Sequence, residues 1–137
     1  MIDKIERLID DNTSEDYWYD VSVFTCQELI NSFSDIEWQQ LSEKVNSYSD
    51  EKKIRIVECL ANIGNKNSFS IILKLSNTEN HDLFMACIDA LRDMDLTDLS
   101  CDEKNDLLQK VKCYSNNASD FEKTILRAFC SSIGQGF

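Results

Sequence analysis

The side chains able to carry out chemistry in this chain are one histidine, six cysteines and many carboxylates. His81 is followed by Asp82 and, six positions on, by Cys87, so these three could in principle ligate a metal ion. Residues six apart on a helix point to different faces. This spacing favours an exposed histidine in a first helical turn, and no metal site is predicted.

The six cysteines are scattered, and no two stand at the C-x-x-C spacing of zinc and redox motifs. They are Cys26, Cys59, Cys87, Cys101, Cys113 and Cys130. An even number allows disulfides, but single cysteines on apolar helix faces are more typical of small buried side chains in a reducing cytosol. We expect reduced, buried thiols.

Catalysis is poorly supported by these residue types. A single histidine provides little for acid–base chemistry near neutral pH. The chain has no glycine-rich phosphate loop, and its carboxylates are so numerous that no one pair marks a glycosidase or metal-dependent site. We therefore predict a protein that is not an enzyme, with no catalytic residue and no cofactor.

The charge balance restricts the possible partners. The 137 residues include 25 acidic and 14 basic side chains, which give a formal net charge of -11. Such a chain is poorly suited to grip a phosphate backbone, so direct binding of nucleic acid is not expected. The start of the chain does not resemble a secretory signal, and no apolar run is long enough to span a bilayer. We expect a cytoplasmic protein that does not bind membranes.

The apolar residues recur at helical spacing throughout, and there is no proline to interrupt a helix. Capping patterns such as Ser34 with Glu37 and Ser100 with Glu103 place several helix starts. The sequence predicts an all-α fold of eight helices. They cover about 2–11, 15–33, 34–48, 49–64 (ending at Gly64), 68–76, 78–94 (capped by Thr78), 100–114 and 119–134 (capped by Ser119 and ending at Gly134).

Two patterns repeat along the chain. The segment from Leu41 to Ser49 returns, with Leu, Lys, Val, Tyr and Ser at the same spacing, from Leu107 to Ser115. A second buried stripe recurs in three later helices. Its members are Ile56, Cys59, Leu60 and Ile63, then Cys87, Ala90, Leu91 and Met94, then Leu126, Phe129, Cys130 and Ile133.

The stretch Cys59-Leu60-Ala61-Asn62-Ile63-Gly64-Asn65 resembles the end of the second helix in HEAT-like helical-hairpin repeats. That resemblance covers about residues 35–134. It implies a short α-solenoid of roughly three hairpins, with residues 1–33 as an N-terminal helical cap, in a single domain spanning 1–137. An irregular helical bundle is the alternative, because Leu, Ile and Lys recur at helical spacing in any amphipathic protein.

The faces opposite the buried stripes carry the candidate binding residues. In stacked hairpins these faces of the second helices commonly line the concave surface. The sequence therefore predicts a carboxylate-rich groove that attracts a basic partner, although a solvated face that keeps the protein soluble is the simpler interpretation of any one carboxylate. The predicted groove residues are Glu51, Glu58, Asp82, Asp89 and Asp93.

Three consecutive aromatic residues, Tyr17, Trp18 and Tyr19, lie among acidic side chains. Neighbours on a helix are turned by about 100°, so the three cannot all face one core. Tyr17 and Trp18 are predicted to support partner binding as a hot spot. Alternatively, Trp18 belongs to the core and the tyrosines cover the edge of the cap.

A small, acidic, all-helical chain of this kind is similar to the immunity proteins of bacterial polymorphic and contact-dependent growth inhibition toxins. That resemblance implies a one-to-one toxin inhibitor acting by protein–protein interaction on a cognate basic toxin domain, often a nuclease. The alternative is a helical-repeat adaptor or scaffold subunit in a larger bacterial assembly. We expect a monomer or a weak homodimer.

Overall fold

In the computed structural model, residues 2–10, 12, 14–97 and 99–133 are described, and all their regular structure is helical. The all-α class and the eight helices predicted from the sequence are confirmed over this part of the chain, counting contiguous helical segments. The segments are α1 (Ile2–Leu8), α2 (Glu15–Tyr17) continued by η1 (Trp18–Ser22) and α3 (Val23–Asn31), α4 (Asp35–Lys44) continued by η2 (Val45–Ser47), α5 (Asp50–Leu60), α6 (Lys66–Leu75), α7 (His81–Leu91), α8 (Cys101–Ser115) and α9 (Asp120–Ser132).

Capping boxes begin three of these helices. Ser34 precedes α4, Ser100 precedes α8 and Ser119 precedes α9, and each hydroxyl accepts a hydrogen bond from the backbone N–H three residues later. The glutamate at that position accepts one in return from the backbone N–H of the serine. These hydrogen bonds confirm the predicted starts of the three helices. The starts could be predicted because a local sequence pattern determines them.

Two other predicted helix starts are wrong. The cap of α7 is Asn80, whose side chain accepts from the Leu83 N–H, while the Thr78 hydroxyl accepts from Asn80 itself in the preceding turn. Likewise, Asn65 caps α6, which begins two residues before the predicted 68. In both places the cap is an asparagine, which is a strong helix cap. Other polar residues lie close to it, so the sequence pattern alone did not identify which residue caps the helix. The last predicted helix end, Gly134, lies outside the described residues.

Gly64 is confirmed as the turn residue after α5. Its φ of +64° is the left-handed conformation that glycine adopts without steric cost. The helix proper ends at Leu60, with a short turn between it and Gly64. This turn leads the chain into α6.

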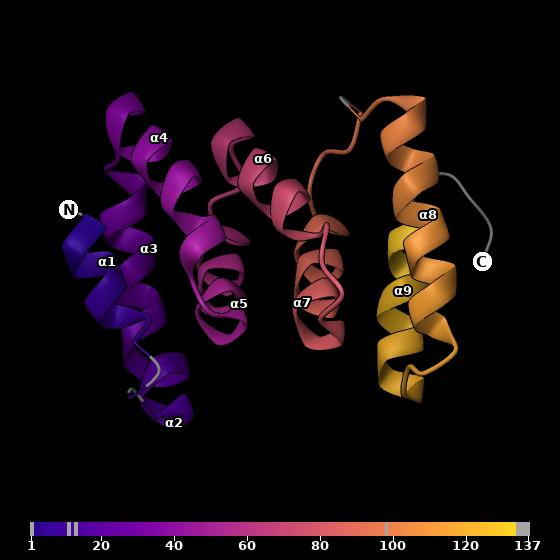
Figure 1. The fold of residues 1–137 in the computed structure, drawn as a ribbon, viewed down its shortest axis with the longest axis horizontal. Coiled ribbons are helices and arrows are strands. Elements are labelled where there is room, and N and C mark those ends of the chain that lie inside the picture. Colours follow the sequence, from indigo (N-terminus) through magenta and orange to yellow (C-terminus); the bar gives the residue numbers. More distant parts are fainter. Residues whose placement is uncertain (1, 11, 13, 98, 134–137) are drawn as a thin grey trace.

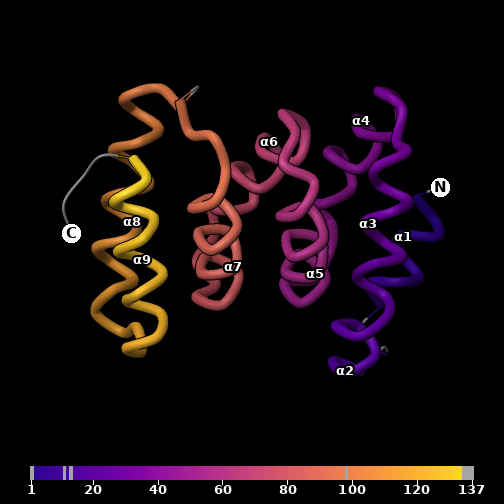
Figure 2. Tube along the Cα trace, turned by 180° about the vertical axis from the view of Figure 1, so that it is seen from behind, coloured from indigo at the N-terminus to yellow at the C-terminus, as the bar shows by residue number. Residues whose placement is uncertain are grey.

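The helices form a row in which α3, α5, α7 and α9 lie side by side (Figure 1). In that row α5 contacts α3 on one side and α7 on the other, and α7 also contacts α9. Viewed from behind, the row lies in front, with α4, α6 and α8 on its far side (Figure 2). The regular HEAT-like hairpin stack remains a prediction, but the row is enough to bring residues of three helices to one face.

One cluster of buried apolar side chains runs through the row, from Ile2 to Cys130. The repeated stripes of α5, α7 and α9 face this core, as the predicted register requires. Of the cysteines, Cys101 and Cys113 are exposed on α8, contrary to the prediction, and the other four are buried. Among the described residues none forms a disulfide. No helix in the described ranges combines the length and apolar character that crossing a bilayer requires.

Candidate functional site

Two adjoining hollows lie over α5, α7 and the continuous segment formed by α2, η1 and α3, each with a volume of about 470 Å³. We call the first the Asp89 hollow. It is lined by Tyr19, Val23, Phe24, Gln27, Val57, Glu58, Ala61, Asn62, Ala86, Asp89, Ala90, Arg92 and Asp93. We call the second the Glu51 hollow. It is lined by Ser14, Glu15, Trp18, Tyr19, Glu51, Ile54, Arg55, Glu58 and Asp82. Two residues, Tyr19 and Glu58, belong to both.

The shared pair is joined by a short hydrogen bond. The Tyr19 hydroxyl donates to Oε2 of Glu58 over 2.6 Å, linking η1 to α5 between the hollows. Burial, followed by this bond to Glu58, raises the pKa of Tyr19 to about 12. Burial also raises the pKa of Glu58, while the Tyr19 hydroxyl and the Arg55 guanidinium oppose that rise. Glu58 is thus a partly desolvated carboxylate at the centre of the face.

Carboxylates outnumber cations around both hollows. Six acidic residues line the two, namely Glu15, Glu51, Glu58, Asp82, Asp89 and Asp93, against the guanidinium groups of Arg55 and Arg92. Arg92 pairs with Asp89 over 2.7 Å, one helical turn along α7. Arg55 lies over the Trp18 ring, 5.5 Å from its centroid. The combined face therefore stays acidic, with its two cations engaged inside the protein.

The aromatic residues at the edge of this face are placed by a π-helical turn. In η1 the carbonyl of Trp18 accepts from the N–H of Val23, five residues on. This wider turn brings Tyr19 and Phe24, also five apart, to the lining of the same hollow. Both are exposed, at 53% and 57% respectively. They provide apolar contact area next to the carboxylates.

Trp18 lies in the core, which is one of the two positions that the sequence left open. It is 1% exposed and is part of the core, so its ring has almost no surface to offer a partner. The alternative that placed Trp18 in the core therefore describes its position, and a contribution of Trp18 to partner binding stays a prediction. Tyr17 is exposed, as a contact residue must be, but it lines neither hollow.

The five predicted carboxylates are brought together on one face. Glu51, Glu58 and Asp82 line the Glu51 hollow, and Glu58, Asp89 and Asp93 line the Asp89 hollow. Sequence reasoning noticed Tyr19 and the acidic side chains beside it, which include Glu15, without choosing either as a site residue. It did not single out Phe24 as a surface residue. The π-helical turn that brings Phe24 to the hollow has no clear sequence signature.

Gln27 adds an unused hydrogen-bond donor to the Asp89 hollow. Its Nε2 is buried, and within the described part of the chain it has no hydrogen-bond partner. A buried amide donor without an acceptor is costly, by about 1–3 kcal/mol. An acceptor brought by a bound molecule would remove that cost.

His81 lies apart from these hollows, at the start of α7. It is half-buried rather than exposed, and its Nε2 is 2.9 Å from Oε2 of Glu122 on α9. Asp82 follows it, while Cys87 is buried in the core, as the different helix faces predicted. The sequence gave no sign of Glu122 as a neighbour of His81, because 41 residues separate them.

Compared with protein-family models, with curated proteins and with solved structures, the chain matches none of them.

Proposed function

We propose that this protein is an immunity protein that binds and neutralises a cognate basic toxin domain through the face formed by the two hollows. One observation carries the proposal: six carboxylates and two exposed aromatic rings line adjoining hollows on three neighbouring helices. A nuclease toxin fits this face because its own active site is built to bind polyanionic phosphate.

The arrangement suits fast and specific capture. Acidic side chains gathered on one face of a chain with net charge -11 steer a cationic partner toward it. Tyr19 and Phe24 supply the aromatic contact area in which binding energy is commonly concentrated. The carboxylates therefore steer the partner toward this face, and the two exposed aromatic side chains provide binding energy once it is in contact.

Glu58 is the anchor of the proposed contact. It is already partly desolvated, so a lysine or arginine placed beside it interacts more strongly than it would with a fully hydrated carboxylate. Asp89 carries its own counterion, Arg92, and the partner's cation would compete with that exposed pair at little cost.

The helical-repeat adaptor remains the second candidate, since the same face could dock a basic segment of an assembly subunit. The two functions differ in what the partner does when alone. A toxin domain kills or arrests the cell in the absence of this protein, whereas an assembly subunit does not.

The test is affinity capture from the native cell followed by mass spectrometry, and then co-expression. We expect the captured protein to be a basic domain, encoded directly upstream of this chain, that is toxic alone and harmless when this protein is co-expressed. A captured partner without toxicity would exclude the immunity function and favour the adaptor. Recovery of abundant ribosomal proteins alone would mean that charge, rather than a specific face, governs binding.

A further inference from the structure

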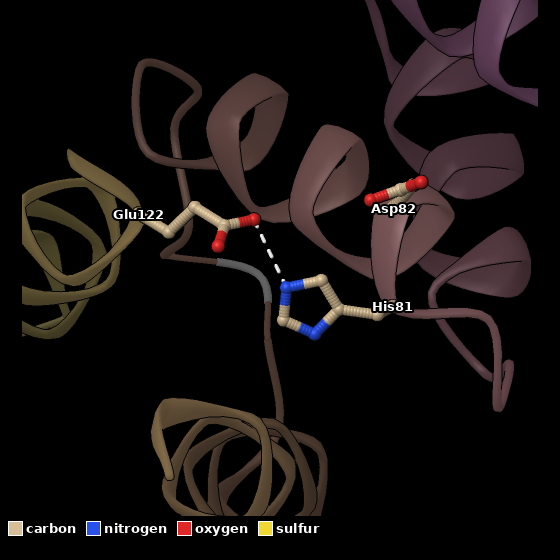
Figure 3. A group of neighbouring side chains, drawn as sticks. All are labelled: His81, Asp82 and Glu122. Carbon is tan, nitrogen blue, oxygen red and sulfur yellow. Dashed lines mark hydrogen bonds and ion pairs between the residues drawn. The ribbon is translucent and has the colours of Figure 1, made fainter. Parts of the chain in front are cut away.

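Three potential metal ligands from two helices meet at one end of α7. His81 and Asp82 are its first two residues, and Glu122 lies in the first turn of α9. One donor atom from each lies within 4.8 Å of those from the other two. Figure 3 shows the Glu122 carboxylate facing the imidazole ring of His81, with the Asp82 carboxylate set to one side of this pair.

The imidazole ring is held in place by its surroundings. It packs against Tyr114, with 5.5 Å between the ring centroids, and Tyr114 in turn stacks on Phe84 at 4.4 Å. The Tyr114 hydroxyl donates to the backbone carbonyl of Thr78 over 2.7 Å. In metal sites, the groups around a ligating imidazole fix its orientation in this way.

Glu122 is likewise oriented before any ion arrives. Its Oε1 accepts from the Ser119 N–H over 2.9 Å, which leaves Oε2 directed at His81. Two hydrogen bonds therefore fix the orientation of this carboxylate before an ion binds.

We propose that His81, Asp82 and Glu122 form a binding site for a divalent transition-metal ion of the Zn²⁺ type. Imidazole nitrogen and carboxylate oxygen bind Zn²⁺ at about 2.0–2.2 Å, and three protein ligands with one water complete a tetrahedral site. Ligand atoms in such a site lie about 3.3 Å apart, and Nε2 and Oε2 of the pair already lie 2.9 Å apart. The ligand atom of Asp82, which is exposed, lies within 4.8 Å of those of the pair, so a small rotation of its side chain would complete the site.

The simpler interpretation is a hydrogen bond that ties α7 to α9 and needs no ion. It places two carboxylates beside one imidazole, however, with no cation to balance the second negative charge. A divalent cation balances both negative charges and joins α7 to α9 more firmly than the hydrogen bond alone. The metal site shares Asp82 with the Glu51 hollow, but its other two ligands lie outside both hollows, so it does not rest on the proposed function.

The experiment is a titration of the full-length, metal-stripped chain with Zn²⁺, followed by calorimetry and thermal unfolding. It uses the background Cys101→Ser with Cys113→Ser, because these exposed thiols can bind Zn²⁺ themselves. We expect one ion per chain and a midpoint of unfolding that rises with Zn²⁺ concentration. We expect His81→Gln, Asp82→Asn and Glu122→Gln each to weaken binding by about tenfold or more.

A matched control separates ligation from helix capping. Glu122→Gln retains a side chain that can complete the capping box, and Glu103→Gln makes the same change in the equivalent box of α8, remote from His81. Glu103→Gln should bind Zn²⁺ like the parent protein. The proposal is wrong if the parent shows no saturable binding, if Glu122→Gln and Glu103→Gln bind equally, or if Asp82→Asn leaves the affinity unchanged.

Discussion

The Tyr19 hydroxyl donates a 2.6 Å hydrogen bond to the Glu58 carboxylate, joining η1 to α5 across 39 residues of sequence. This bond stands at the boundary between the Asp89 hollow and the Glu51 hollow, and both residues line both. It holds a partly desolvated carboxylate in place beside an exposed aromatic ring. The candidate face is therefore organised around one defined contact.

Replacing Tyr19 by phenylalanine tests how much that contact stabilises the fold. Tyr19→Phe removes the donor and leaves Glu58 with one fewer partner, so we expect the free energy of unfolding to fall by about 1 kcal/mol. Urea denaturation followed by circular dichroism measures it. Tyr17→Phe is the matched control, because Tyr17 is similarly exposed at 55% but lines neither hollow. Equal effects of the two substitutions would show that the bond contributes nothing specific.

The raised pKa of Glu58 makes stability depend on pH. Between the ordinary glutamate value of 4.5 and the raised one, the folded state holds a proton that the unfolded state has released. Stability therefore falls as pH rises through this window, and the loss is complete above the raised pKa. Glu58→Gln removes the titration, so its unfolding free energy should fall less than that of the wild type over the same range. Parallel pH profiles of the two proteins, from urea denaturation, would contradict this account.

The sequence predicts this fold well where the determining signals are local. Ser34 and Ser100 mark their helix starts through contacts only three residues long. The repeated stripes of α5, α7 and α9 are buried as predicted, because helical periodicity alone fixes which side of a helix is apolar. Where two polar residues compete as a cap, as Thr78 and Asn80 do, a local pattern is not enough.

The candidate site was harder to predict because its contacts are distant in sequence. The carboxylates of α5 and α7 could be placed on one face from the repeat alignment, but neither Tyr19 with Glu58 nor His81 with Glu122 has a local signature. The π-helical turn also rotates the residues after Trp18 relative to an α-helical register. The sequence therefore left the position of Trp18 open and did not single out Phe24 as a surface residue.

Because Trp18 is buried in the core, we predict that replacing it strongly lowers the stability of the fold. Trp18→Ala would leave a cavity in the core, remove the ring over which Arg55 lies, and cost about 3–5 kcal/mol. Tyr17→Ala, one residue earlier on the exposed side, should change stability by less than about 0.5 kcal/mol. Thermal or urea unfolding distinguishes them. A Trp18→Ala protein as stable as Tyr17→Ala would mean that the indole is not part of the core.

Gly64 offers a test of the turn between α5 and α6. Its φ of +64° disfavours any side chain, yet no atom lies within 4 Å of where a Cβ would be built. The cost of Gly64→Ala should therefore be backbone strain alone, about 1–2 kcal/mol. Gly64→Asn should cost less, because asparagine tolerates this conformation. Equal losses for both in urea denaturation would point to a different cause.

The central claim is that a specific acidic face, and not the overall negative charge, binds the partner. Two double substitutions change the net charge equally. Asp89→Lys with Asp93→Lys, in and just after α7, reverses the charge of two carboxylates in the Asp89 hollow; we call this the α7 variant. Asp102→Lys with Asp106→Lys reverses the charge of two exposed carboxylates of the same spacing on α8; we call this the α8 variant. Circular dichroism checks whether each variant keeps its helicity, which we expect because all four substitutions are at exposed positions.

The decisive measurement is the affinity of the wild type and of both double variants for the basic protein that the wild type captures from its native cell. We predict that the α7 variant binds at least about 100-fold more weakly, because its lysines set like charges against a basic partner, and that the α8 variant stays within about threefold of the wild type. Equal weakening of the two variants, or unchanged binding by the α7 variant, would contradict the assignment of this face.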